Sequence, residues 1–278
     1  MKYNKKIYAG IVLYNPDIIR LEENICNICT QVDKLVLIDN SSKNIDEINK
    51  LLTKFNGVVL VKNIENKGIA YALNQIGKIS NDENADWFLT IDQDSICDKN
   101  LISEYIKFVN VKSVGQITCN IIDRNFGNEG KYIETKYEEI EYCITSGTLV
   151  NVEAYNICGG FDERLFIDKV DWDFSLSLKE NGYKTIKIAF DGLIHEIGKK
   201  AEIITIGRHR HTIFNHSSIR RYYIARNAIY CAKKHKDISL LRILMATIFD
   251  IIIVFLFEKD KCLKLKKSLQ GLFEGFYI

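Results

Sequence analysis

The sequence predicts an α/β protein with a mostly parallel sheet covered by helices on both faces, followed by a helical region. Two observations carry this prediction. Short apolar segments alternate with helix-like segments over the first hundred residues, as in β-α-β units, and the pattern turns helical from Ser217 onward. With 278 residues, of which 47% are hydrophobic, the chain suits one large domain with a tail, expected at residues 1–215 and 216–278.

The first hundred residues contain four strand candidates, each a short apolar segment between polar turns. They are Ile7–Tyr14, Leu35–Ile38, Val58–Val61 and Trp87–Ile91. The helix candidates between them are Asp17–Thr30, Ile45–Phe55 and Ile69–Ile79. Further strands are expected over residues 114–151, and another helix begins near Val170. Ligands of such sheets bind beyond the carboxyl ends of the strands, so the residues after each strand are the functional candidates.

Composition argues against one class of function, and the amino-terminal residues indicate a cellular compartment. The 38 Lys and Arg residues nearly balance the 36 Asp and Glu residues, which argues against a nucleic-acid-binding surface. The first six residues lead into a strand candidate with no apolar leader, so we expect a cytoplasmic, reducing setting. Cys26 and Cys29 form the only C-x-x-C pair, and they lie in a helix candidate where cysteine packs as a small hydrophobic residue.

Acidic residues follow two of the strand candidates. Asp92 and Asp94, one residue apart, can present oxygens to Mg²⁺ or Mn²⁺, which in turn binds phosphate. Although D-x-D is common in solvated turns, its position after a buried strand favours a metal site. Asp39 can accept hydrogen bonds from a nucleotide base or ribose, or it can cap a turn. Gly68 at a helix start, with Lys67 beside it, favours an anion.

Further motifs follow these in a fixed order along the chain. The full series is Ile11-Val12-Leu13-Tyr14-Asn15-Pro16, Ile38-Asp39-Asn40-Ser41-Ser42, Asn66-Lys67-Gly68 with Ala72 and Asn74, Asp92-Gln93-Asp94, Ser146-Gly147, Gly159-Gly160-Phe161-Asp162-Glu163, Leu165-Phe166-Ile167-Asp168-Lys169-Val170-Asp171-Trp172-Asp173 and Leu193-Ile194-His195-Glu196-Ile197-Gly198. This series resembles the family 2 glycosyltransferases, and most of all their bacterial rhamnosyltransferase branch. The resemblance covers about residues 7–235.

The resemblance implies an inverting, metal-dependent glycosyltransferase with the A-type nucleotide-sugar fold. It implies that Asp39 binds the base or ribose, and that Asp92 and Asp94 hold Mg²⁺ or Mn²⁺ on the donor diphosphate. His195 would be a further metal ligand or a diphosphate contact, and Asp171 matches the catalytic base. The chemistry agrees, because an attacking hydroxyl needs a carboxylate to take its proton and a departing diphosphate needs cationic stabilisation.

The other substrate-binding candidates come from the same motifs and from the helix candidate after them. The motif positions are Asn15, Asn66, Lys67, Gly68, Asn74, Gly147 and Asp173. Arg220 and Arg226 can clamp phosphate or form a solvated basic face. Asp171 and Asp173 point in different directions on a helix, so they cannot both face the acceptor. The chain departs from the family at Ser177, where many relatives have an Arg, so any ion pair of that Arg is missing.

The sequence therefore predicts an enzyme at the inner face of the cytoplasmic membrane that transfers rhamnose from dTDP-rhamnose to a lipid-linked cell-surface polysaccharide. One alternative keeps the reaction with UDP-galactofuranose, UDP-galactose or UDP-glucose as donor. Another is a non-catalytic nucleotide-sugar-binding subunit of a polysaccharide assembly complex, but such a subunit has no need of the base Asp171. A nucleotidyltransferase would carry a Gly-rich basic loop where this chain has Tyr14-Asn15-Pro16.

The carboxyl-terminal region has its own partner candidates. Ser239–Phe257 is apolar, but Arg242 and Asp250 interrupt it, and each central charge costs a spanning helix about 2.5–3.5 kcal/mol. Lysines between positions 259 and 267, interleaved with Leu263 and Leu265, fit a helix on anionic lipid. The alternative is a helix pair packed on the domain or on another subunit of a homo-oligomer.

Overall fold

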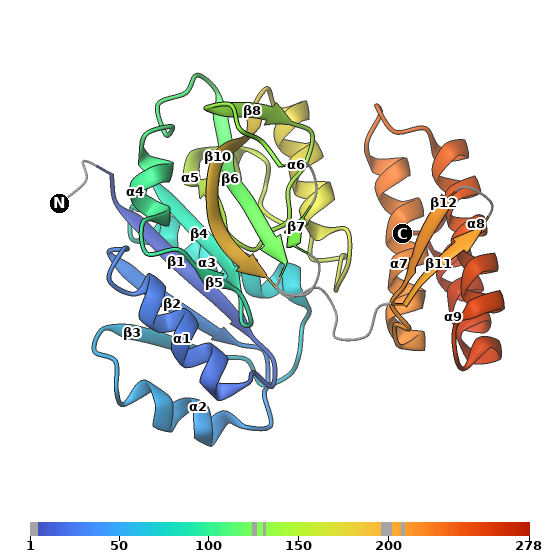
Figure 1. Cartoon of the computed structure of the whole chain (residues 1–278), viewed down its shortest axis with the longest axis horizontal. Coiled ribbons are helices and arrows are strands. Elements are labelled where there is room, and N and C mark those ends of the chain that lie inside the picture. The colour runs from blue at the N-terminus through green and yellow to red at the C-terminus, as the bar shows by residue number, and fades with distance from the viewer. Residues whose placement is uncertain (1–4, 124–126, 130–131, 196–201, 207–208) are drawn as a thin grey trace. The chain divides into compact units, whose positions relative to one another are not determined.

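A computed structural model describes residues 5–123, 127–129, 132–195, 202–206 and 209–278 (Figure 1). The strands and helices expected in the first hundred residues are confirmed, as β1 (Ile7–Leu13), α1 (Ile18–Ile28), β2 (Lys34–Asp39), α2 (Ile45–Leu52), β3 (Val58–Lys62), α3 (Ile69–Asp82) and β4 (Trp87–Asp92). After them come β5 (Ile96–Cys97), α4 (Leu101–Ile106), β6 (Val114–Asp123), β7 (Gly127–Glu129), β8 (Tyr137–Ile140), β9 (Thr148–Asn151), α5 (Val152–Ile157), α6 (Val170–Glu180) and β10 (Lys184–His195). The carboxyl-terminal elements are β11 (Glu202–Ile206), β12 (His209–Ile213), α7 (Ser218–Lys234), α8 (Leu240–Phe257) and α9 (Lys261–Glu274).

The main sheet has the strand order β3-β2-β1-β4-β9-β6-β10-β5, and β7 and β8 pair with its second half. The parallel pairing expected from the sequence is confirmed for β3-β2-β1-β4. It does not extend to β9, which runs antiparallel to both β4 and β6. The reason is that strict strand–helix alternation, the signal for parallel pairing, ends with β4.

Helices cover both faces of this sheet. Successive strand residues point to opposite faces, and the apolar side chains on each face pack against helices. Odd-numbered residues of β1, such as Ile7 and Ile11, join a fully buried core with α1, α2 and α4. The opposite face holds Gly10, where an added Cβ would lie 2.3 Å from Ile76 of α3. On the same side Phe88 of β4 makes an edge-on ring contact with Tyr155 of α5, 5.3 Å between centroids.

The chain forms two compact units, Met1–Arg164 with Val170–Ile197, and Leu165–Lys169 with Gly198–Ile278. The second unit therefore includes residues 165–169 and 198–215, which the sequence analysis assigns to the first domain. In the second unit α7 and α9 pack closely, because Gly271 has no side chain: an added Cβ would lie 2.1 Å from the carbonyl oxygen of Tyr222. Ser217 and Ser239 cap α7 and α8 by accepting backbone N–H bonds.

All eight cysteines are free thiols. Cys26 lies in α1 but is exposed, and Cys29, which caps the carboxyl end of α1, is half-buried, so the expected packing as small hydrophobic residues does not hold for Cys26. Burial raises the pKa of the Cys29 thiol, which keeps it protonated and makes it a poor metal ligand or nucleophile.

Candidate active site

The register of β1 with its two neighbours places two acidic residues at the same edge of the sheet. Leu13 of β1 pairs with Asp39 of β2, and Val12 pairs with Asp92 of β4. The backbones of Asp39 and Asp92 thus lie on either side of β1, about 10 Å apart at two strand spacings. This edge is formed by the carboxyl ends of the parallel strands, where the sequence predicts the ligand.

A second set of contacts fixes the turn after β4. The side-chain amide of Gln93 accepts a hydrogen bond from the backbone N–H of Tyr14 at 2.7 Å and donates to the Tyr14 carbonyl at 3.2 Å. The short strand β5 pairs antiparallel with the end of β10 through Ile96 and Ile194. This pairing brings His195 to the turn that carries Asp92 and Asp94.

Asp92, Asp94 and His195 form one group. Each offers one ligand atom, these atoms lie within 4.8 Å of one another, and all three side chains are half-buried. The two carboxylates fit a hard divalent cation such as Mg²⁺ or Mn²⁺, because both ions prefer oxygen ligands. The residues that the sequence predicts as the metal site are thus together in space, although Asp92 and His195 lie 103 positions apart in a chain of 278 residues.

Two buried serines connect this group by a chain of hydrogen bonds. The Asp92 backbone N–H donates to Ser146 Oγ at 3.0 Å, Ser146 Oγ donates to Ser95 Oγ at 2.8 Å, and Ser95 Oγ lies 2.8 Å from His195 Nδ1. Both serine side chains are excluded from solvent. Sequence reasoning did not select either serine as a site residue, although Ser95 directly follows the acidic motif and Ser146 precedes Gly147.

Counting protons along this chain assigns the histidine tautomer. The two buried serine hydroxyls have one proton each, and two hydrogen bonds can take these protons: Ser146 to Ser95, and Ser95 to His195 Nδ1. If Nδ1 carried a proton, one hydroxyl would have no acceptor among the described residues, at a cost of about 1–3 kcal/mol. The arrangement therefore favours Nδ1 as acceptor and Nε2–H as donor. A Nε2–H group suits a diphosphate oxygen, whereas metal ligation through Nε2 would need the other tautomer.

Asp39 lies at the other side of β1 and is buried, with 2% of its surface exposed. Its two carboxylate oxygens share the backbone N–H of Ser42, at 3.2 and 3.3 Å. These are the hydrogen bonds that the carboxylate makes within the described residues. A carboxylate accepts more donors than this, so Asp39 retains acceptor capacity for a base or ribose group.

The neighbouring predicted residues shape the loops at this edge. Asn15 ties the β1–α1 loop to the β2–α2 loop, because its Oδ1 accepts from the Lys43 backbone N–H at 2.8 Å. Asn66 Oδ1 accepts from the backbone N–H of Gly68, whose φ of 89° suits glycine at the start of α3. Lys67 lies over the ring of Tyr71, 4.9 Å from its centroid.

Asn74 and Gly147 both make structural contacts in this fold. Asn74 of α3 donates to the Phe161 carbonyl and to Glu163, and its Oδ1 accepts from the Phe161 backbone N–H at 2.8 Å. It thereby ties α3 to the loop after α5. Gly147 has φ 71°, and an added Cβ would lie 2.9 Å from Leu193, so this position needs glycine both for its backbone and for space.

Asp171 lies in the first turn of α6, outside the metal group, and is half-buried. Its Oδ1 accepts the Trp172 backbone N–H at 2.8 Å. Asp173, two positions further along α6, is fully buried. Gln116 of β6 donates to Ser175 Oγ at 2.7 Å, and Ser175 donates to the Asp171 carbonyl at 2.9 Å. This chain of bonds holds the backbone of Asp171 to the sheet.

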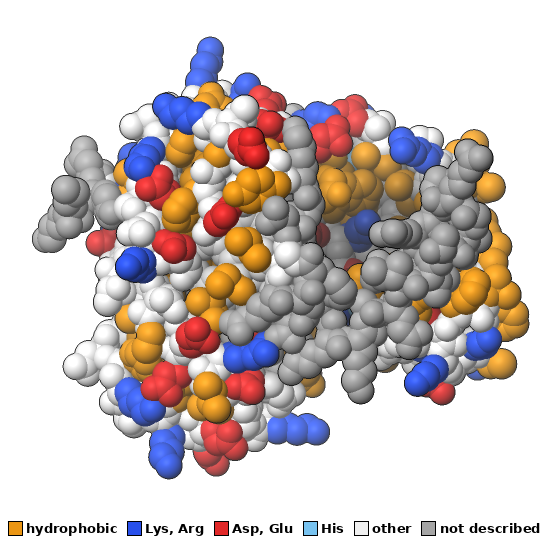
Figure 2. Space-filling model, viewed as in Figure 1, with side chains coloured by type: hydrophobic (Ala, Val, Ile, Leu, Met, Phe, Trp, Pro, Cys, Tyr) orange, Lys and Arg blue, Asp and Glu red, His pale blue; other side chains and the backbone are white. Residues whose placement is uncertain are grey.

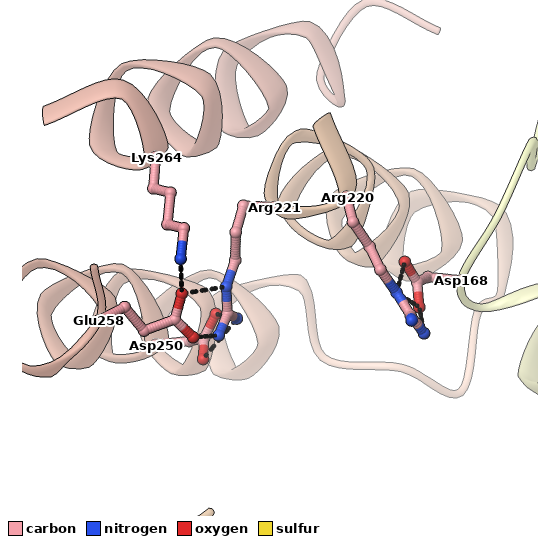
Figure 3. A network of polar contacts seen from close by, with 6 residues as sticks. All are labelled: Asp168, Arg220, Arg221, Asp250, Glu258 and Lys264. Carbon is pink, nitrogen blue, oxygen red and sulfur yellow. Dashed lines mark hydrogen bonds and ion pairs between the residues drawn. The ribbon is translucent and has the colours of Figure 1, made fainter. Parts of the chain in front are cut away.

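Arg220 and Arg226 both lie on α7, in the second unit. The Arg220 guanidinium pairs with both oxygens of Asp168, at 2.9 to 3.2 Å (Figure 3). The Arg226 guanidinium lies over the Tyr223 ring, 4.8 Å from its centroid. Their predicted contacts with substrate phosphate stay predictions. Residues 196–198 of the last motif lie outside the described residues.

A comparison with protein-family models matches residues 9–165, more than half of the chain, to glycosyl transferase family 2. The chain belongs to this family. A second comparison, with curated proteins, finds that this family 2 chain is 29% identical over 293 residues to the dTDP-rhamnosyl transferase RfbF of Shigella flexneri. That alignment covers 98% of this chain and 96% of RfbF. The resemblance stated from the motifs is thereby confirmed for the family and for its rhamnosyltransferase-like branch.

Solved structures share the fold of this family 2 glycosyltransferase. Residues 1–349 of TarS from S. aureus align with a TM-score of 0.63 at 10% identity, over 97% of this chain and 80% of that one. GalNAc-T7 with UDP, GalNAc and Mn²⁺ aligns with a TM-score of 0.56 at 14% identity, over 69% of this chain and 43% of that one. These likenesses confirm the expected A-type glycosyltransferase fold.

Proposed function

We propose that this glycosyltransferase moves rhamnose from dTDP-rhamnose, with inversion, to a hydroxyl of a lipid-linked polysaccharide precursor at the cytoplasmic face of the membrane. The observation that carries the proposal is the full-length likeness to a dTDP-rhamnosyl transferase. The grouping of Asp92, Asp94 and His195 at the carboxyl edge of the sheet supports a donor diphosphate there.

The donor is bound along the edge formed by β2, β1 and β4. Asp39 accepts hydrogen bonds from the thymine imide or the sugar hydroxyl of the nucleotide. The diphosphate lies on the far side of β1, where Asp92 and Asp94 hold Mg²⁺ or Mn²⁺ and His195 Nε2–H donates to a diphosphate oxygen. A divalent cation bound there supplies positive charge that stabilises the departing diphosphate.

Asp171 acts as general base. Its carboxylate takes the proton of the acceptor hydroxyl as the hydroxyl oxygen attacks the anomeric carbon and the bond to the diphosphate breaks. Because the attack comes from the side opposite the leaving group, one base is enough and no covalent intermediate is needed. The bonds from Gln116 through Ser175 hold the backbone of Asp171, and the Trp172 N–H bond to Oδ1 orients its carboxylate.

The test is a set of single-donor incubations of the purified chain with dTDP-rhamnose, UDP-galactofuranose, UDP-galactose or UDP-glucose, each with Mg²⁺ or Mn²⁺. Released nucleoside diphosphate is read by mass spectrometry. We expect dTDP from dTDP-rhamnose, and loss of that release in chelator and in Asp94→Ala.

Each other outcome corrects a defined part of the proposal. Release of UDP from one of the UDP-sugars, with none from dTDP-rhamnose, assigns a different donor. Full activity in chelator would show that the reaction does not need a divalent cation. Binding of dTDP-rhamnose without any turnover, in the presence of lipid-linked acceptor, would instead support a non-catalytic subunit.

A further inference from the structure

The outer face of α8 is a continuous apolar stripe. Its exposed residues recur at helical spacing on one side of the helix, and each has between 38% and 70% of its surface exposed. They are Leu241, Met245, Ile248, Phe249, Ile252, Phe255 and Leu256. The stripe is about 22 Å long at 1.5 Å per residue. An uninterrupted apolar face of this size marks a surface that contacts lipid or protein.

The inner face of α8 is equally well defined and carries charge. Arg221 of α7 pairs with Glu258 at the end of α8 and with Asp250 in its middle, the latter at 3.1 Å (Figure 3). Lys264 of α9 pairs with the same Glu258 at 2.9 Å, and the side chains of Arg221, Glu258 and Lys264 are all buried. Burial raises the pKa of Glu258, but the hydrogen bonds from Arg221 and Lys264 outweigh it and lower that pKa.

This network argues against α8 as a membrane span. Among the described helices α8 is the one that is long and apolar enough to cross a bilayer. To cross, it would have to leave α7 and α9, and Asp250 would then lie in hydrocarbon while Arg221 and Lys264 lost their partners. A helix that keeps these bonds can expose only its outer face to lipid.

The charges around the stripe select the kind of surface. Arg242 is exposed near its start, and Lys259, Lys261 and Lys266 are exposed after its end. The stripe itself contains no acidic residue. Figure 2 shows hydrophobic side chains along the edge where Figure 1 draws α8 and α9, with Lys or Arg side chains beside them. Apolar side chains flanked by lysines are the pattern of helices that lie in an anionic bilayer interface.

We propose that the stripe on α8 lies in the headgroup–acyl boundary of an anionic membrane, with α8 parallel to the surface and still bonded to α7 and α9. This inference rests on the proposed function in one respect: a lipid-linked acceptor lies in the membrane, so the enzyme must bind there to reach it. It names the docking surface and its orientation, which the proposed function leaves open.

The test is flotation of the full chain with vesicles of phosphatidylcholine alone or with phosphatidylglycerol. We expect the chain to float with the anionic vesicles. Flotation should be weaker in 1 M salt, and alkaline carbonate should release the chain completely. Phe249→Glu with Ile252→Glu should weaken binding by about tenfold or more. Ile19→Glu, which places one glutamate at an exposed isoleucine of α1, should bind like the unchanged chain.

A second variant keeps the test decisive if the double variant does not fold. Phe249→Trp conserves an aromatic side chain, and brominated lipid should quench it beyond the quenching of the unchanged chain, whose tryptophans are Trp87 and Trp172. No flotation, equal flotation of the double variant, or no added quenching overturns the proposal. Carbonate resistance would assign a span, and a vesicle-free dimer abolished by the double variant would assign the stripe to a second copy.

Vesicle binding and donor binding can be tested separately. Binding of dTDP, measured by calorimetry without vesicles, should be the same for the unchanged chain and the stripe variants. If vesicle binding behaves as expected and dTDP does not bind, the donor assignment fails and the docking surface stands.

Discussion

Asp171 and Asp39 serve opposite ends of the proposed reaction, so the same substitution has different expected effects. Asp171→Asn keeps the hydrogen bond from the Trp172 N–H but removes the proton acceptor, and transfer should fall by about 10²–10⁴-fold with unchanged dTDP affinity. Asp39→Asn should weaken dTDP binding with a smaller effect on kcat. Steady-state kinetics and calorimetry separate the two. Near-normal turnover of Asp171→Asn, together with inactive Asp173→Asn, would place the base elsewhere.

The serine chain gives a prediction for His195 that does not depend on activity. In the unchanged chain, imidazole ¹⁵N shifts should report the Nε2–H tautomer, because Ser95 donates to Nδ1. Ser95→Ala removes that donor, so the tautomers should mix and dTDP affinity should fall by up to about tenfold. Ser103→Ala, at a half-buried serine of α4 away from His195, is the control. A Nδ1–H tautomer in the unchanged chain contradicts the assignment and restores His195 as a metal ligand.

At the scale of single residues, the sequence identifies the acidic motif but not its supports. Asp92 and Asp94 can be found because they follow a buried strand, and His195 because its motif resembles that of the family. Ser95 and Ser146 lie 51 positions apart, and no periodicity links two hydroxyls at that distance. The same holds for Gln116 and Ser175, which are 59 positions apart.

At the scale of elements, local patterns predict β1 to β4 and the helices between them, because each is a regular segment with its own turn or cap. Asp17, for example, caps α1 by accepting from the backbone N–H groups of Ile19 and Arg20. The antiparallel β9 and the two-residue β5 are not predictable in this way. Their places depend on long-range pairing, and it is β5 that brings Ser95 to His195.

The packing of α9 on α7 also gives a prediction. Gly271→Ala would place a Cβ 2.1 Å from the Tyr222 carbonyl oxygen, which belongs to the backbone and cannot rotate away. The helices must separate, so we expect the free energy of unfolding to fall by about 1–3 kcal/mol. Chemical denaturation measures it. Gln270→Ala, at the exposed neighbouring position, should change stability little, and equal effects of the two variants would contradict this packing.

At the scale of the whole molecule, stability should depend on pH through His216. Burial, with the nearby charges of Arg220 and Arg221, lowers its pKa from 6.5 to about 4, despite the opposing charges of Asp168 and Glu258. Between these values the unfolded chain binds the proton and the folded chain does not. Stability is therefore fully present above pH 6.5 and falls as the pH drops toward 4, by up to about 3 kcal/mol.

Denaturation curves between pH 7 and 5 check this, because most carboxyl groups stay ionised in that window. His216→Gln removes the titrating group and should flatten the pH dependence there. An unchanged slope in His216→Gln would show that another group is responsible.

The mass of the product tests the proposed rhamnosyl transfer most directly. The chain, Mg²⁺ and a membrane extract of lipid-linked glycans are incubated with dTDP-rhamnose and the three UDP-sugars at equal concentration. We predict that glycans gain the mass of a deoxyhexosyl residue, and that Asp171→Asn and Asp94→Ala suppress the gain. A gain of a hexosyl mass would contradict the proposal. So would glycans that gain no mass while the unchanged chain and Asp171→Asn consume dTDP-rhamnose equally.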